Sequence, residues 1–257
     1  MDINNKKIVL TGASSGIGLS LLKMLLNYKN VRIIAVARHI ETIPYRDGIV
    51  FPFSADLSNE AGVNRLFEYT QSIFGETDIF IANAGYAYLE KLSNADWKHI
   101  EDIFTLNTFS PIYSLQKLAE QGVLKPKCFV CTISAVAQVP LPYYSLYCST
   151  KAALHQFMES YRYESPVNMH VMAVYPVATR TSFFEKAANE KQPPIPFLSQ
   201  SAYTVSKAII KGIEKNKKRV YLSFLFRIFK IFGQNLPFIF SLYSFSEKRK
   251  VDKNLHL

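Results

Sequence analysis

Short apolar runs alternate with longer segments of helical periodicity over the first two-thirds of the chain. The apolar runs predict strands at residues 7–11, 31–37, 49–53, 78–82, 128–133, 168–175 and 220–222. The segments between them predict helices at 17–28, 59–74, 97–121 and 144–163. Strands that are apolar along their whole length and separated by helices indicate a parallel sheet covered on both faces. We therefore predict an α/β fold over residues 1–222, a three-layer single domain built on a doubly wound parallel sheet.

Residues 181–201 interrupt this alternation. The segment contains Phe183, Phe184 and three prolines, and it has no periodicity. Long irregular segments of compact domains are usually lids or disordered loops. We favour a lid, because the segment follows a strand whose carboxyl end should face the ligand site.

Residues 223–257 form a basic, aromatic C-terminal extension. If the first part is helical, Ser223, Arg227, Lys230 and Gln234 make one narrow polar stripe, and the other residues up to Phe232 are Phe, Leu or Ile. The polar residues and a proline interrupt the apolar stretches, so a membrane span is not expected. Four interpretations stay open: a cap over an apolar substrate pocket, a homo-oligomer interface, an interfacial helix on an anionic membrane, or ordinary core packing. The basic clusters at 217–219 and 248–250 favour the membrane.

The net charge of +10 is concentrated in the same region. Residues 204–257 hold 12 Lys and Arg against 3 Asp and Glu, whereas residues 1–203 hold 18 against 17. This distribution argues against a nucleic-acid-binding groove across the body. Three cysteines without a disulfide framework, and no signal-peptide pattern, predict a cytoplasmic protein, possibly peripheral to the membrane. Cys128 and Cys131 should lie on opposite faces of one buried strand, so no metal site is expected.

A glycine-rich turn joins the first strand to the first helix. Residues 11–18 read Thr-Gly-Ala-Ser-Ser-Gly-Ile-Gly, with glycines at 12, 16 and 18. Glycines at this place allow a tight turn and let backbone amides approach a pyrophosphate at the positive end of the helix. The turn indicates a dinucleotide cofactor.

The end of the second strand favours NADP(H). An acidic residue there would bind the ribose hydroxyls of NAD, but the sequence has Ala37 followed by Arg38. Arg38 offers a cation suited to a 2′-phosphate; the alternative is a solvated loop arginine.

Ser134, Tyr147 and Lys151 carry the strongest chemical signal. Tyr147 and Lys151 are four residues apart on a predicted helix and so share a face. A lysine ammonium near the phenol should lower the tyrosine pKa, and the phenol could then exchange a proton with a carbonyl or an alcohol. Ser134, at the end of the fifth strand, could hydrogen-bond the same substrate oxygen.

Over residues 7–181 the motifs resemble those of the short-chain dehydrogenase/reductase family, in the same order. The resemblance implies a Rossmann-type fold and a catalytic set of Asn107, Ser134, Tyr147 and Lys151, with Asn107 holding a water and Lys151 also binding the nicotinamide ribose. Asp56 matches an acidic residue near the adenine, and Asn83-Ala84-Gly85 matches a family motif. The full cofactor-binding set expected is Gly12, Ser14, Ser15, Gly16, Ile17, Gly18, Arg38, Asp56, Leu57, Asn83, Ala84, Gly85, Tyr147, Lys151, Pro176, Thr179 and Thr181.

One position departs from the family pattern. Val177 follows Pro176 where the family usually has glycine. If the backbone there needs a positive φ, valine would be costly and the local geometry must differ.

These observations predict an NADP-dependent oxidoreductase that interconverts a carbonyl and a secondary alcohol. A non-catalytic NADP-binding scaffold or sensor is the alternative of another class, although binding alone does not need a tuned phenol. A reductase of lipid-like or acyl ketones at the membrane surface is a further enzymatic alternative, suggested by the aromatic tail.

Overall fold

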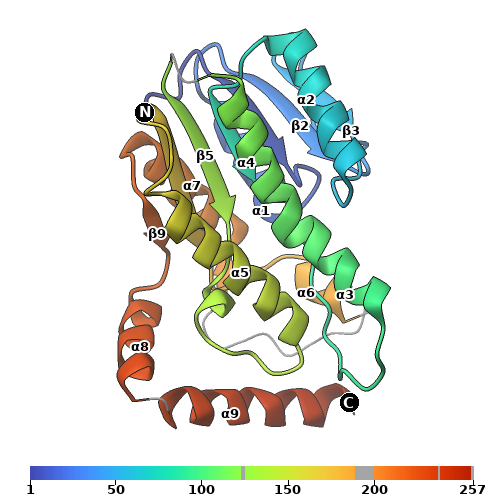
Figure 1. The fold of residues 1–257 in the computed structure, drawn as a ribbon, viewed down its shortest axis with the longest axis vertical. Helices are drawn as coiled ribbons and strands as arrows, with labels where there is room; N and C mark the ends of the chain where they lie inside the picture. The colour runs from blue at the N-terminus through green and yellow to red at the C-terminus, as the bar shows by residue number, and fades with distance from the viewer. Residues whose placement is uncertain (123–124, 189–198, 237, 256–257) are drawn as a thin grey trace.

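Parallel strands form a seven-stranded sheet at the centre of the molecule, counted over the residues that the structure describes (Figure 1). The structure is a computed structural model, and it describes residues 1–122, 125–188, 199–236 and 238–255. The strand order is β3-β2-β1-β4-β5-β6-β9. The strands are β1 (Lys7–Thr11), β2 (Arg32–Ala37), β3 (Val50–Ser54), β4 (Ile79–Ala82), β5 (Lys127–Thr132), β6 (Met169–Tyr175) and β9 (Arg219–Tyr221). The order reverses between β1 and β4, which is where doubly wound sheets bind ligands.

Helices cover both faces of the sheet. They are α1 (Gly16–Leu25), α2 (Glu60–Phe74), α3 (Trp97–Phe104), α4 (Ser110–Glu120), α5 (Ser145–Tyr161) and α7 (Ala202–Glu214). Apolar residues of α1 and α7 pack with one set of strand residues, and those of α2, α4 and α5 pack with the alternate set. The predicted three-layer α/β fold of the Rossmann type is confirmed.

The two cysteines of β5 illustrate the alternation of the strand. Cys128 packs into the core under α1 and α7, whereas Cys131 packs into the core on the other face. Both are fully buried free thiols, as the strand period predicts.

The helix predicted at 97–121 is the main departure from the expected elements. It is divided by a π-helical segment at Thr105–Phe109, which separates α3 from α4. α3 itself begins after Asp96, whose side chain accepts a hydrogen bond from the His99 amide and caps the helix.

Three short elements follow the sixth strand, where the sequence predicted an irregular lid. β7 (Ala178–Arg180) pairs with β8 (Ser199–Ser201), and α6 (Phe183–Ala187) lies between them in the sequence. Residues 189–198, the central part of the predicted lid, lie outside the described residues.

The C-terminal extension folds into two helices, α8 (Phe224–Asn235) and α9 (Phe238–Leu255). Ser223 caps α8 by accepting a hydrogen bond from the Phe226 amide. The two helices lie at the end of the molecule toward which the strand carboxyl ends point (Figure 1). The Tyr143 hydroxyl donates a hydrogen bond to Asp252, and Ser244 Oγ donates one to Pro140 O at 3.2 Å. These two bonds connect α9 to the loop before α5. No helix among the described residues is long and apolar enough to cross a membrane.

Candidate functional site

A cavity of about 1560 Å³ lies at the carboxyl ends of the sheet strands. Its lining includes the residues after β1, β2, β3, β4, β5 and β6. Every residue of the predicted catalytic and cofactor sets lines this cavity except Gly18 and Asn107. Those two lie directly behind the lining, as described below. Among the described residues, no group of three or more His, Cys, Asp or Glu could hold a metal ion.

The glycine turn has backbone geometry that side chains would obstruct. Gly12 and Gly16 adopt φ values of +68° and +53°, which L-residues rarely adopt. A Cβ on Gly18 would lie 2.0 Å from Gly12 O, so α1 approaches the turn as closely as a glycine allows. Ser15 makes no side-chain cap, and the first turn of α1 has no acidic residue. The positive end of α1 therefore faces the cavity and suits an anionic group.

Thr11 connects this turn to the turn after β4. Its buried hydroxyl accepts hydrogen bonds from the amides of Asn83 and Ala84, at 2.9 and 3.0 Å, and donates to Ile81 O at 3.3 Å. Asn83 Nδ2 donates in return to Thr11 O at 3.2 Å. The two turns on either side of the strand-order reversal thus form one rigid wall.

Arg38 and Asp56 lie after neighbouring strands, β2 and β3. The Arg38 side chain is exposed and makes no hydrogen bond or ion pair in the part of the chain that the structure describes. Partial burial raises the Asp56 pKa, but hydrogen bonds from the Ser58 amide and hydroxyl and the charge of Arg38 lower it further, so the net shift is downward. The site therefore presents a free guanidinium and an ionised carboxylate at this end of the cavity.

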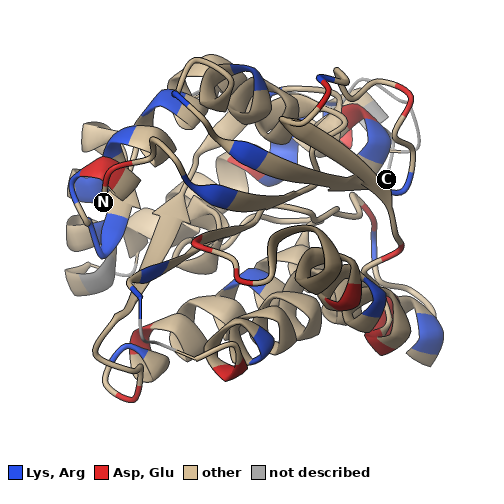
Figure 2. Ribbon diagram, turned by 90° about the horizontal axis from the view of Figure 1, so that it is seen from above, with Lys and Arg blue, Asp and Glu red and all other residues tan. Residues whose placement is uncertain are grey.

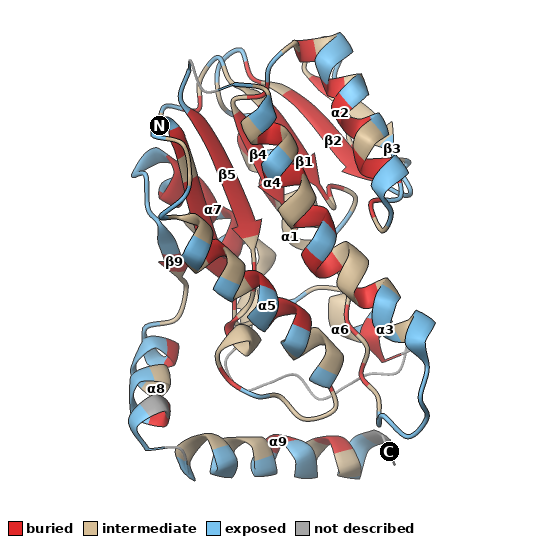
Figure 3. Cartoon of the chain, viewed as in Figure 1, coloured by how far each residue is buried: buried red, intermediate tan, exposed pale blue. Residues whose placement is uncertain are grey.

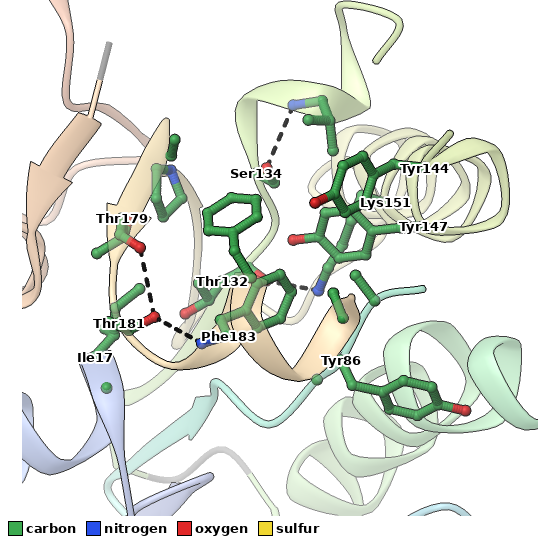
Figure 4. A pocket seen from close by; sticks show the side chains of 18 of the residues that line it. Ile17, Tyr86, Thr132, Ser134, Tyr144, Tyr147, Lys151, Thr179, Thr181 and Phe183 are labelled. Carbon is green, nitrogen blue, oxygen red and sulfur yellow. Dashed lines mark hydrogen bonds between the residues drawn. The ribbon is translucent and has the colours of Figure 1, made fainter. Parts of the chain in front are cut away.

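Ser134, Tyr147 and Lys151 converge at the other end (Figure 4). Ser134 follows β5, and Tyr147 and Lys151 are on α5. Lys151 Nζ donates to Thr132 O at 3.1 Å and lies 5.8 Å from the centre of the Tyr147 ring. The Ser134 hydroxyl accepts a hydrogen bond from the Val136 amide at 3.3 Å and is close enough to the Tyr147 phenol to lower its pKa. The structure therefore brings the three side chains singled out from the sequence together in one place.

The pKa of Tyr147 is raised, whereas the sequence predicted that Lys151 would lower it. Burial raises the pKa of the phenol, and the Ser134 hydroxyl offsets only part of that shift. Burial also lowers the pKa of Lys151. Desolvation outweighs the expected effect of the lysine, and the phenol is neutral in this structure.

Asn107 is placed by the π-helical segment. Its side chain is fully buried, with Nδ2 donating to Tyr86 O at 2.8 Å and to Thr150 Oγ1 at 3.2 Å. Its Oδ1 accepts from the Tyr86 amide at 3.1 Å. A Cβ on Gly85 would meet both Asn107 Oδ1, at 2.9 Å, and Lys151 Nζ, at 3.6 Å. Gly85 therefore leaves the space through which the amide and the ammonium approach each other. π-helical turns of this kind often occur at functional sites.

The backbone at Val177 is unstrained. Val177 is not among the described non-glycine residues with positive φ, so valine is accommodated where the family usually has glycine. Thr179 Oγ1 donates to Val177 O at 3.0 Å, and Thr181 Oγ1 accepts from the Phe183 amide at 3.3 Å. The Thr181 side chain lies 3.3 Å from a Cβ placed on Gly16, so this segment reaches the glycine turn.

The remaining walls of the cavity are largely aromatic and aliphatic, and only the lid and the cap were anticipated from the sequence, without their lining residues. The Phe183 ring lies 5.5 Å from that of Tyr147 (Figure 4), and Tyr144 precedes Tyr147 by one helical turn. α8 and α9 close the cavity, and of the four interpretations of the tail the cap is the one this contact supports. The lining residues of these helices are Leu225, Phe226, Ile228, Phe229, Phe232, Ile239, Tyr243, Ser246, Glu247 and Lys250. Spacings of three and four residues along α9 could have indicated its inner face, but the sequence did not show what it would cover.

A family model described as short chain dehydrogenase matches residues 6–192. Among curated proteins, an 11-beta-hydroxysteroid dehydrogenase-like protein of Arabidopsis thaliana is 28% identical over 229 residues, which is 84% of this chain and 72% of the relative.

Solved structures share the fold. A short chain dehydrogenase of Burkholderia cenocepacia in complex with NADP has a TM-score of 0.78 at 21% identity, and the match covers 91% of this chain and 94% of that one. A short chain dehydrogenase/reductase of Burkholderia phymatum in complex with NAD has a TM-score of 0.80 at 17% identity, covering 91% and 95%.

Proposed function

The chain belongs to the short-chain dehydrogenase family, and from that premise we propose that it transfers a hydride between NADP(H) and the carbonyl or secondary alcohol of an apolar substrate. The observation that carries the proposal is the single cavity that joins the glycine turn to Ser134, Tyr147 and Lys151. A dinucleotide-binding turn and a proton donor in one enclosed space are what carbonyl reduction requires.

The turn after β1 fits a dinucleotide. Gly12 and Gly16 let the backbone approach a pyrophosphate, and the uncapped N-terminus of α1 offers it amide donors and a positive dipole. Asn83 and Thr11 hold the facing wall. When bound, the nicotinamide would supply or accept the hydride.

Side chains of the protein would transfer the proton. Reduction of a ketone needs an acid that is protonated at neutral pH, as a tyrosine phenol is, and burial raises the pKa of Tyr147 further. Ser134, close to the phenol, would hold the substrate oxygen beside it. Lys151, held by Thr132 O, would bind the ribose and favour phenolate once the proton has left.

NADP(H) is favoured over NAD(H) by the free guanidinium of Arg38. A charge-assisted contact with a 2′-phosphate is worth about 1.5–3 kcal/mol, or roughly ten- to a hundredfold in affinity. Ala37 precedes Arg38, so the end of β2 has no carboxylate that would repel the phosphate. Asp56 would instead lie near the adenine.

An apolar ketone is favoured by the aromatic walls that α6, α8 and α9 contribute. The Phe183 ring packs against the Tyr147 ring, and Phe226 and Phe229 of α8 add further apolar lining to the same cavity. A relative named for a hydroxysteroid is consistent with a substrate of this kind.

The proposal is tested by following NADPH oxidation by the purified chain against panels of ketones, steroids and acyl substrates. Tyr147→Phe should lower kcat by roughly 10²–10⁴-fold, the usual contribution of a proton donor, and leave the NADPH dissociation constant nearly unchanged. Tyr144→Phe is the matched control: it removes a hydroxyl from the same cavity and should retain most turnover. Substantial turnover by Tyr147→Phe would contradict the assignment. NADPH binding without turnover of any substrate would favour the scaffold instead.

A further inference from the structure

The outward surface of α8 and α9 is apolar. α9 presents two opposite stripes, an inner one that lines the cavity and an outer one that begins with Phe238, Leu242 and Phe245. Figure 3 shows exposed residues along both helices on the side away from the body. The exposed large apolar residues of this segment are Phe224, Leu225, Ile228, Ile231, Phe232, Leu236, Phe238, Leu242 and Phe245. Nine exposed large apolar residues on and between two consecutive helices exceed the scattered apolar residues of an ordinary surface, and such a concentration marks an interaction surface.

The charges of the two helices are sorted by sign. Their acidic side chains are turned inward: Glu247 is buried and bonded to Lys250 at 2.6 Å, and Asp252 is bonded by Tyr143. Exposed cations follow the apolar stripe along α9, and one more lies on α8. Those of α9 are Lys248, Arg249 and Lys253, and the one on α8 is Arg227.

Over much of the rest of the molecule, Lys and Arg are interspersed with Asp and Glu (Figure 2). Residues 207–219 are a second basic stretch, with six Lys and Arg against one Glu. Arg249 also stacks over the Phe245 ring, with its guanidinium carbon 4.3 Å from the ring centre. An apolar stripe that continues into unpaired cations is complementary to a surface that is apolar inside and anionic at its edge.

Cavity-lining and outward apolar residues occur on the same helix, α8. Leu225, Ile228 and Phe232 line the cavity and are accessible, at 59%, 37% and 54% exposed. Phe224 and Ile231 are exposed on the same helix and do not line the cavity. A molecule in an apolar phase against α8 would therefore lie beside one wall of the cavity.

We propose that α8 and α9 dock the protein on an anionic phospholipid bilayer and that the catalytic cavity receives its substrate from the lipid; the second part rests on the proposed function. Docking is interfacial, because no helix among the described residues could span the bilayer. A second copy of the chain is a poorer partner, because a two-fold interface would set the cations of one copy against those of the other.

Sedimentation of the full chain with vesicles tests the docking. Phosphatidylcholine vesicles that contain phosphatidylserine should bind the protein, and pure phosphatidylcholine vesicles should bind it far more weakly. Lys248→Gln, Arg249→Gln and Lys253→Gln together should weaken binding by on the order of 100-fold, since each cation contributes about fivefold. The triple variant Lys23→Gln, Lys29→Gln and Lys211→Gln removes the same charge from exposed sites on and beside α1 and α7 and should bind nearly as the parent does.

The apolar stripe is tested separately. Phe238→Ser, Leu242→Ser and Phe245→Ser should abolish vesicle binding, whereas Tyr163→Ser and Val167→Ser, at exposed sites beyond α5, should not. Far-UV circular dichroism and NADPH affinity show whether each variant is folded. Parent protein that ignores phosphatidylserine vesicles at low salt, or equal losses in the charge and control triples, would overturn the proposal. Dissociation of a dimer by the serine triple would assign the surface to a second copy and overturn it too.

Turnover separates this proposal from the proposed function. Once a substrate is known, the variant with all three serine substitutions should reduce a water-soluble ketone at the parent rate. It should reduce a ketone dissolved in vesicles more slowly than the parent does. Equal rates of the parent and the triple on the vesicle-dissolved ketone would refute delivery from lipid. Vesicle binding without any NADPH oxidation would leave docking standing and refute the proposed function.

Discussion

Replacement of Thr11 by valine should destabilise the protein far more than the loss of one hydroxyl usually does. The hydroxyl accepts from the amides of Asn83 and Ala84, and valine has the same shape but no acceptor. Each amide left without a partner costs about 1–3 kcal/mol, so the free energy of unfolding should fall by about 2–6 kcal/mol. This is a large fraction of the 5–15 kcal/mol or so that is typical of a folded domain.

Thr70→Val is the matched control. Thr11 and Thr70 are 3% and 1% exposed, so both substitutions are made in the core. The Thr70 hydroxyl only donates, to Leu66 O one helical turn earlier at 2.7 Å, and its loss leaves no amide unpaired. We expect a cost of about 1 kcal/mol or less for Thr70→Val. Thr11→Ser keeps the acceptor and should cost only about 1 kcal/mol for the missing methyl.

Equilibrium unfolding in urea, followed by far-UV circular dichroism, measures the three costs. Titration with NADPH under folding conditions then shows whether the turn after β4 has moved. The reasoning is refuted if Thr11→Val is destabilised no more than Thr70→Val, because the two amides would then have found other partners.

Further predictions concern the glycine turn, an ion pair and the proton donor. Gly18→Ala would place a methyl 2.0 Å from Gly12 O, so calorimetric titration should show NADPH affinity reduced at least tenfold, on the order expected when a backbone contact is displaced. Glu159, bonded by Arg219, has its pKa lowered from 4.5 to about 2. The stabilisation that this ion pair provides is therefore present above pH 4.5 and lost as the pH falls toward 2. Thermal melts of Glu159→Gln should show a free energy of unfolding about 1–2 kcal/mol below that of the parent at pH 7, after solvent screening, and no difference near pH 2. Because the pKa of Tyr147 is raised, the rate of ketone reduction should stay constant through neutral pH and fall only in alkaline solution, whereas alcohol oxidation should rise with pH; a reduction rate that falls between pH 6 and 8 or so would contradict this.

The sheet could be predicted from the sequence because its strands are buried on both faces. Runs such as residues 33–37 are apolar throughout, the pattern expected of a doubly covered parallel sheet. The order of the strands follows from the alternation of strand and helix and from the place of the glycine turn. Their ends shifted by a residue or two, since hydrogen bonding rather than composition sets them.

α9 was not predicted as a helix for a physical reason. Its outer stripe, with Phe238 and Leu242, and its inner stripe, with Ile239 and Tyr243, are both apolar over the first turns. Nearly every position of these turns is therefore apolar, and the segment lacks the polar face that the prediction of an amphipathic helix depends on. The same arrangement lets one helix serve the cavity and the outer surface.

Part of the candidate site could likewise be predicted from the sequence, and part could not. Ser134, Tyr147 and Lys151 could be found because their spacing on a strand end and a helix brings them together. The pKa of Tyr147 could not be predicted, because it depends on how many distant residues exclude water from the phenol. The apolar walls from α6 and α8 are likewise contributed by tertiary contacts alone.

The π-helical segment at Thr105–Phe109 makes chain length itself a constraint at this site. A turn of this kind holds one residue more than a regular helical turn. Deletion of one of the residues beside Asn107 would let the helix close into an ordinary α-helix, with α3 and α4 in nearly the same phase, and would change the direction of the side chains within the turn itself. Asn107 would then leave the space beside Gly85, although no residue of the catalytic set had been substituted. The segment should thus tolerate many changes of side chain better than the loss of a single position.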